Sequence, residues 1–243
     1  VGMSRWLSTY NILRHNIMSF NLPPGEVISE VEIAQKLNLS RTPVRNAISK
    51  LVFDGLIYVE PQKETIVRKI DLRQMQEILF FRSRIETEII KKACMEYSEE
   101  GINLLKKNLK DQEKYYKDMD LEKTLELDTR MHKMIFEHCG YGHVWKVIQK
   151  NSQNSNRVRY LKLVFGLNKS PDSSISVIMD WTTTINEHKK YIDRIEKKNQ
   201  KGLDELVVKH VSNIYDDAVK LSKLFPDYFT GVDKSRDIDI FLQ

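Results

Sequence analysis

The sequence has only two cysteines, Cys94 and Cys139, in 243 residues. Two thiols are too few for a disulfide framework, and such sparse use of cysteine fits a protein of the reducing cytosol. The chain also lacks a signal-peptide pattern, internal repeats and low-complexity tracts, and no apolar run is long enough to span a membrane. We therefore expect a cytoplasmic protein with no membrane partner.

A strong excess of one charge is missing as well. The net charge is +5, from 39 basic and 34 acidic side chains. Residues 1–70 contain 9 basic and 6 acidic side chains, whereas the rest of the chain contains 30 and 28. Positive charge is thus denser at the front of the chain, as a nucleic-acid-binding module requires. Because the whole-chain excess is mild, attraction to phosphates should be local.

The length of the chain allows two modest domains, and a hydrophobic content of 41% is enough for a packed core. The first 70 residues predict three helices followed by a short β-hairpin. The expected helices are 6–20, 30–37 and 40–53, and the expected strands are 56–59 and 65–68. Asp71 can cap a new helix, with Gln74 three residues later. No flexible linker separates the two parts, so we expect them to be coupled directly.

The stretch from Ser29 to Lys50 contains two short helical patterns that meet at a tight turn. Ser29 can cap the first helix, with Glu32 placed three residues later as in a capping box. The second helix has a stripe for burial, made of Val44, Ala47, Ile48 and Leu51. Arg41 and Arg45, four residues apart, fall together on its exposed face. This arrangement is typical of a helix-turn-helix that enters the major groove, and an ordinary helix pair with solvated charges is the alternative.

Four groups of residues carry a more specific pattern. They are Pro24-Gly25, Ile28-Ser29-Glu30, Leu39-Ser40-Arg41-Thr42-Pro43-Val44-Arg45 and Asp54-Gly55-Leu56-Ile57. Together they resemble the winged helix-turn-helix of GntR-type bacterial transcription regulators. The resemblance implies that Ser40, Arg41, Thr42 and Arg45 face DNA, and that Lys63 lies near the tip of the wing.

The chain departs from this family at two positions. Val31 stands where many relatives have arginine, so one expected contact with phosphate or base is absent. Glu64 stands where the wing tip usually has glycine, which argues against entry of the wing into the minor groove.

From residue 72 onward nearly all of the sequence has helical periodicity. The predicted helices, about six, are 72–96, 99–117, 120–138, 142–166, 175–198 and 202–224. The predicted fold is therefore mostly α. A winged helix-turn-helix of three helices and a small β-hairpin wing occupies 1–70, and an all-helical domain for effector binding and dimerisation occupies 71–225. The C-terminal tail, 226–243, has no assignment beyond packing on a neighbour.

Three of these helices have polar residues within an apolar stripe. The stripes are Leu121, Leu125, Asp128, His132 and Ile135; Trp181, Ile185, His188, Ile192 and Ile195; and Val207, His210, Ile214, Ala218 and Leu221. A buried imidazole or carboxylate is costly unless it is paired, and one alone would be explained by a hydrogen bond in the core. Three histidines and one aspartate are better explained by a divalent metal held between facing helices.

A second set of residues supports the same site. It comprises Asp128-x3-His132, Glu187-His188, Lys209-His210 and Arg82-x-x-Ile85-Glu86. These residues resemble the FCD effector domain of the FadR-like branch of GntR regulators, and the combined resemblance runs from about Leu7 to Leu224. It implies that Asp128, His132, His188 and His210 bind the metal. Three imidazoles and one carboxylate suit zinc, nickel, manganese or iron.

The resemblance also implies a ligand for the second domain. In the family the effector is commonly a small carboxylate bound beside or on the metal. Arg82 lies on the inward stripe of the first helix of this domain and could pair with such a carboxylate through two hydrogen bonds. A buried ion pair between Arg82 and Glu86 is the alternative.

Taken together, the sequence predicts a DNA-binding transcription regulator and not an enzyme. We expect a homodimeric repressor on an inverted-repeat operator, because twofold protein symmetry is mirrored in the DNA site. A small organic acid is expected to control operator affinity. Two alternatives stay open: a regulator that senses the metal alone, and a metal-dependent hydrolase with a DNA-binding appendage. The hydrolase is disfavoured because the stripes contain no convincing additional acid or base.

Overall fold

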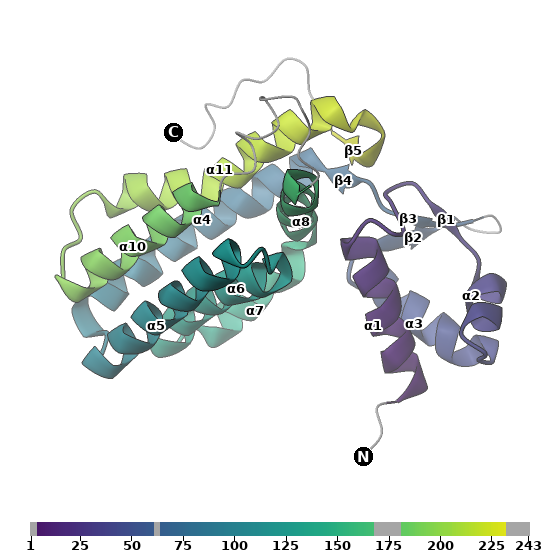
Figure 1. Cartoon of the computed structure of the whole chain (residues 1–243), viewed down its shortest axis with the longest axis horizontal. Helices are drawn as coiled ribbons and strands as arrows, with labels where there is room; N and C mark the ends of the chain where they lie inside the picture. The colour runs from purple at the N-terminus through teal and green to yellow at the C-terminus, as the bar shows by residue number, and fades with distance from the viewer. Residues whose placement is uncertain (1–3, 61–63, 168–180, 232–243) are drawn as a thin grey trace.

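The computed structural model describes residues 4–60, 64–167 and 181–231. Lys63 and most of the predicted tail lie outside these ranges. The described residues form two hydrophobic cores, one in residues 4–69, which we call the head, and one in residues 70–231, which we call the rear domain. Both parts are mainly helical, with little sheet (Figure 1). The predicted mostly α fold, with a small sheet in the head, is confirmed.

The head contains the predicted three helices and the hairpin. They are α1 (Arg5–Met18), α2 (Glu30–Lys36) and α3 (Arg41–Phe53), with strands β2 (Ile57–Val59) and β3 (Thr65–Val67). Ser29 caps α2, since its side-chain oxygen accepts the N–H of Glu32 at 3.3 Å. The stripe from Val44 to Leu51 is buried, as predicted from its spacing. Local signals therefore determine this part of the chain well.

The sheet of the head has a third strand that the sequence analysis did not predict. Strand β1 (Val27–Ile28) pairs antiparallel with β3, which gives the strand order β1-β3-β2. Two residues carry too little pattern to predict a strand. This strand forms because β3 offers it an unpaired edge, and such edges are open to further pairing.

The rear domain is built from helices in the described ranges. They are α4 (Leu72–Glu96), α5 (Glu99–Lys117), α6 (Leu121–His138), α7 (Gly142–Asn151), α8 (Gln153–Leu167), α10 (Thr182–Glu196) and α11 (Leu203–Leu224). Figure 1 shows α4, α10 and α11 side by side, with α5, α6 and α7 as a second layer. Helix α8 closes the end of the domain nearest the head, and it contacts α1.

The helix predicted at 142–166 is divided into two. The first part, α7, ends at Asn151, and the second part, α8, begins at Gln153 after Ser152. The side chains of Asn151 and Ser152 donate to the carbonyls of Val147 and Ile148 at 2.8 and 2.7 Å. Asparagine and serine compete in this way with backbone hydrogen bonding, which favours a break. Within the helix predicted at 175–198, α10 begins at Thr182 with Trp181 at its N-cap position, and residues 168–180 lie outside the described ranges.

The chain after α11 returns to the junction between the two parts. A short 3-10 helix, η1 (Pro226–Tyr228), leads into strand β5 (Phe229–Thr230). This strand pairs in parallel with β4 (Ile70–Asp71), the segment that connects the head to α4. The beginning of the predicted tail is thus part of the packed structure, and it links the end of α11 to the connection between the domains.

Candidate functional site

Three predicted histidines meet inside the rear domain. His132 lies on α6, His188 on α10 and His210 on α11, and one nitrogen from each lies within 4.8 Å of the others. Nε2 of His132 is 3.3 Å from Nε2 of His210. The ring centroid of His188 lies 5.3 Å from that of His132 and 4.9 Å from that of His210. The three apolar stripes therefore direct their imidazoles to one place.

Each imidazole has a polar group beside its other ring nitrogen, a hydrogen-bond partner for His188 and His210 and a carboxylate contact for His132. The Nδ1 pairs are His132 with Glu86, His188 with Gln112 at 3.0 Å, and His210 with Glu187 at 2.8 Å. An Nδ1–H that donates to such an acceptor leaves the lone pair on Nε2. Metal-binding histidines are commonly oriented by hydrogen bonds of this kind. Three neutral rings with their Nε2 lone pairs directed inward are therefore the arrangement that the contacts favour.

The electrostatics of the cluster keep its imidazoles neutral and its carboxylate charged. Burial lowers the pKa of His132, His188 and His210, most strongly for His188. Burial alone would raise the pKa of Glu86, but the Arg82 guanidinium and His132 hold it well below its usual range. Neutral imidazole is the form that binds metal, so the histidines are ready to bind without first losing a proton.

Asp128 lies at the edge of this cluster and is 2% exposed. Its Oδ1 is 3.5 Å from Nε2 of His188, whereas Oδ2 pairs with the guanidinium of Arg159 on α8. Burial, followed by repulsion from Arg82, lowers the pKa of Arg159 to about 9, so Arg159 still carries a positive charge at neutral pH. Arg159 was not among the site residues predicted from the sequence. The signal in the sequence that could have identified Arg159 is a positively charged residue among the buried positions of α8.

The arrangement fits a divalent transition metal. Nε2 of His188 is buried and has no hydrogen-bond partner among the described residues, which is costly for a polar atom. The nitrogens of His132 and His210 and the carboxylate of Asp128 lie next to it. Imidazole with carboxylate is a donor set that zinc and its neighbours in the first transition row accept. The ligand roles of these four residues stay predictions.

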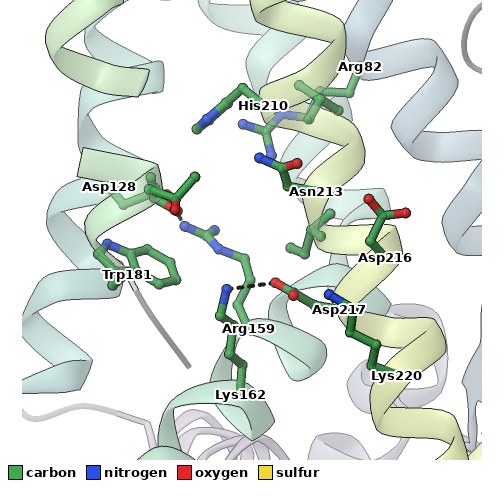
Figure 2. A pocket seen from close by; sticks show the side chains of 14 residues that line it. Arg82, Asp128, Arg159, Lys162, Trp181, His210, Asn213, Asp216, Asp217 and Lys220 are labelled. Carbon is green, nitrogen blue, oxygen red and sulfur yellow. Dashed lines mark hydrogen bonds and ion pairs between the residues drawn. The ribbon is translucent and has the colours of Figure 1, made fainter. Parts of the chain in front are cut away.

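A cavity of about 590 Å³ opens beside His210 (Figure 2). Its lining includes Arg82, Asp128, Arg159, Lys162, Trp181 and His210. Nε of Arg82 donates to Glu86 at 2.8 Å, so the structure contains the ion pair that was the alternative to effector binding. Arg82 also lines the cavity, and its predicted role toward an acid stays open to test.

The residues predicted to face DNA are exposed at the start of α3. They are Ser40, Arg41, Thr42 and Arg45. One carboxylate oxygen of Glu30 lies 3.7 Å from Arg41 and 3.3 Å from Arg45, and the two arginine side chains are 60% and 62% exposed. Ion pairs this exposed are weak, so both guanidiniums stay available to an anionic partner. No helix in the described ranges combines the length and hydropathy that crossing a membrane requires.

Comparison with known proteins gives two family matches. Residues 7–67 match the bacterial regulatory proteins of the gntR family, and residues 77–213 match the FCD domain. The HTH-type transcriptional repressor RspR of Escherichia coli is 26% identical over 221 residues, which cover 91% of this chain and 92% of RspR.

Two solved structures share the fold. Escherichia coli McbR aligns with a TM-score of 0.65 and 18% identity, covering 92% of this chain and all (100%) of the McbR chain. Lar, which controls expression of the Listeria monocytogenes agr system, aligns with a TM-score of 0.58 and 17% identity, covering 91% of this chain and 99% of the Lar chain.

Proposed function

Because this chain belongs to the gntR family of bacterial regulatory proteins and carries an FCD domain, we propose that it is a repressor controlled by a small carboxylate. The family and the relatives are transcription regulators, not enzymes. In our proposal a homodimer of the FadR-like branch binds an inverted-repeat operator. The acid binds at or near a divalent transition metal in the rear domain and sets the affinity for DNA.

The observation that carries the proposal is the meeting of three imidazole nitrogens within 4.8 Å, inside a domain joined to a helix-turn-helix head. His132, His188, His210 and Asp128 would hold the metal. The bound metal would supply positive charge and an open position for a carboxylate. His210 and Asp128 also line the cavity, so an acid in the cavity would lie beside the metal ligands.

The head would bind DNA through the first turn of α3. Arg41 and Arg45 would contact base edges or phosphates, while Ser40 and Thr42 would contact the sugar–phosphate backbone. Their exposure and their place at a helix N-terminus support these roles, because helix N-termini favour phosphate. Lys63 would contact DNA from the wing.

Repression is the direction that the relative RspR supports, since RspR is a transcriptional repressor. An effector must bind two states of the protein unequally to change the affinity for DNA. The route to the head is short, because α8 lines the cavity through Arg159 and contacts the connection between the domains through Arg157. A shift of α8 on effector binding would therefore alter the position or freedom of the head.

The proposal can be tested by selecting operator DNA from a random library with the purified full-length chain. We expect enrichment of an inverted repeat that binds one dimer. Affinity for that DNA is then measured with metal-loaded protein, with chelator-treated protein and with metal-loaded protein plus small carboxylates. A change produced by an acid only when metal is present supports the proposal. A change produced by metal alone supports the metal-sensing alternative, and enrichment of no sequence contradicts DNA recognition altogether.

A further inference from the structure

Three nearly buried cations line the cavity, and each is paired with a carboxylate. The pairs are Arg82 with Glu86 at 2.8 Å, Lys162 with Asp217 at 2.7 Å, and Arg159 with Asp128. The three cationic side chains are only 10–11% exposed. An acid that enters the cavity therefore meets cations that already have carboxylate partners. To bind one of these cations, the acid must take the place of the carboxylate that is paired with it.

The three carboxylates differ in what else they contact. Glu86 is held by Arg82 and by Nδ1 of His132, on the side of the ring away from the shared Nε2 position. Asp217 contacts the ammonium of Lys162. Asp128 alone among the three lies on the Nε2 side of the cluster, 3.5 Å from the unpartnered Nε2 of His188. Asp128 thus stands between two positive sites, the guanidinium of Arg159 and the position where a metal would bind.

Resting on the function proposed above, we propose that Arg159 binds the carboxylate of the effector, and that Asp128 leaves Arg159 to become a ligand of the metal. Without metal, Arg159 holds Asp128. With metal, Asp128 joins the three histidines, and the guanidinium donates its hydrogen bonds to the carboxylate of a small acid in the cavity. Figure 2 shows the guanidinium directed at Asp128 within the cavity lining, next to Trp181.

The cost of an unpaired buried charge favours binding of the acid at Arg159 over binding at Arg82 or Lys162. An acid on Arg82 or Lys162 would leave Glu86 or Asp217 without its cation, and uncompensated charge in such a site is strongly unfavourable. At Arg159, the metal compensates Asp128 and the acid compensates Arg159. The guanidinium can bind a carboxylate through two parallel hydrogen bonds, and the ring of Trp181, 5.5 Å away, supports it.

A thermodynamic consequence follows from the shared partner. If metal binding makes Arg159 available, an acid must bind more tightly to the metal-loaded protein, and the metal must bind more tightly when the acid is present. This reciprocity is required by linkage, and coupling between two sites is typically about 5- to 150-fold. We expect about tenfold here, because one ion pair is exchanged.

The metal affinity of Arg159 variants tests the exchange without knowledge of the natural effector. Zinc affinity of the full-length chain is measured by competition with a chromophoric chelator in chloride buffer. Arg159→Ala should bind zinc about tenfold more tightly than the wild type, because no cation then competes for Asp128. Lys162→Ala is the matched control: it removes a cavity cation from the same helix, but its partner Asp217 is not one of the predicted metal ligands, so zinc affinity should stay unchanged.

Acetate serves as the probe for the carboxylate arm, at ionic strength matched with chloride. Saturating acetate should tighten zinc binding to the wild type about tenfold and should have no effect on Arg159→Ala. Arg159→Gln, which keeps a hydrogen-bond donor and most of the volume, takes the place of the alanine variant if that variant fails to fold. It should show the same loss of the acetate effect.

Several results would overturn the exchange. They are equal zinc affinities of Arg159→Ala and the wild type, an equal gain in Lys162→Ala, an acetate effect that persists in Arg159→Ala, and a wild type indifferent to acetate. Failure of the exchange is distinguishable from failure of the proposed function. A wild type that binds no zinc, nickel, manganese or iron refutes the metal site itself, whereas metal binding that ignores Arg159 refutes only the exchange.

Discussion

The head and the rear domain place their arginines in opposite environments. In the head, Arg41 and Arg45 are 60% and 62% exposed and share one weak partner, Glu30. In the rear domain, Arg157 and Arg159 of α8 are buried, and each is bound to internal groups. Exposed arginines are available to an external polyanion, whereas buried ones determine how parts of the protein are held together. This difference in exposure assigns DNA binding to the arginines of the head and the control of that binding to the arginines of the rear domain.

Arg157 illustrates the second role. It is fully buried, and its guanidinium donates to the carbonyls of Arg68 and Lys69 and to the side chain of Asn154. None of these partners is a carboxylate. Burial, followed by repulsion from Arg68, lowers the pKa of Arg157 to about 10, so it remains charged at neutral pH. A buried cation that binds the last two residues of the head, directly before β4, ties the end of the head to α8.

Removing the imidazoles should break the rear domain's function most severely while sparing the head. In His188→Ala combined with His210→Ala, we expect metal affinity to fall by more than about 100-fold, because changes to groups that merely orient metal ligands already cost 10- to 100-fold. Metal content after reconstitution, measured by elemental analysis, gives the answer. His143→Ala, a change at an exposed histidine of α7, is the control. Full occupancy in the double variant would refute the ligand assignment.

Arg157→Ala should cost about 3 kcal/mol of the free energy of unfolding, because it removes a fully buried side chain together with its hydrogen bonds to the carbonyls of Arg68 and Lys69. Denaturant unfolding measures the loss. Arg130→Ala, at an exposed position of α6, should change stability by less than about 0.5 kcal/mol. If Arg157 ties the connection to α8, hydrogen exchange at residues 68–71 should also quicken in the variant. Unchanged exchange there would mean that the arginine only fills space.

The head could be predicted from sequence more completely than the rear domain, and the reason is the range of the interactions. The cap at Ser29, the stripe that begins at Val44 and the pair Arg41 and Arg45 all depend on residues at most a few positions apart. Among the described helices and strands of the head, only β1 escaped prediction, because its pairing with β3 is non-local and its two residues carry no pattern.

In the rear domain, periodicity predicted which helices direct histidines inward, but it did not identify what each histidine contacts. Gln112, which holds His188, lies 76 residues away in the chain. Asp128 and Arg159 lie on different helices, 31 residues apart. The choice between Arg82 as an acid-binding residue and Arg82 as the partner of Glu86 likewise depends on which groups the packed helices bring together. Such pairings follow from tertiary contacts that no local spacing encodes.

Arg45→Ala should weaken binding to the selected operator about tenfold and leave metal binding intact. An arginine that contacts a base contributes about 1–3 kcal/mol, and loss of a phosphate contact would instead lower the salt dependence of binding. Fluorescence anisotropy at several salt concentrations separates the two. Arg130→Ala removes an exposed arginine of the rear domain and should change nothing. An operator affinity equal to that of the wild type would remove Arg45 from the DNA contacts.

Glu30→Ala should have the smallest effect of these changes, and it should strengthen operator binding, whereas Arg45→Ala weakens it. Glu30 accepts from Arg45 at 3.3 Å and lies 3.7 Å from Arg41, so it competes with DNA for both guanidiniums. An exposed ion pair contributes about 0.2–1 kcal/mol, and its removal should tighten operator binding by a factor of about 1.4 to 5. Glu26→Ala removes the same charge from an exposed position of the head and isolates the local contact from the general field. An equal gain in both variants would mean that Glu30 acts only through its charge, and that the arginines of α3 are as accessible with Glu30 present as without it.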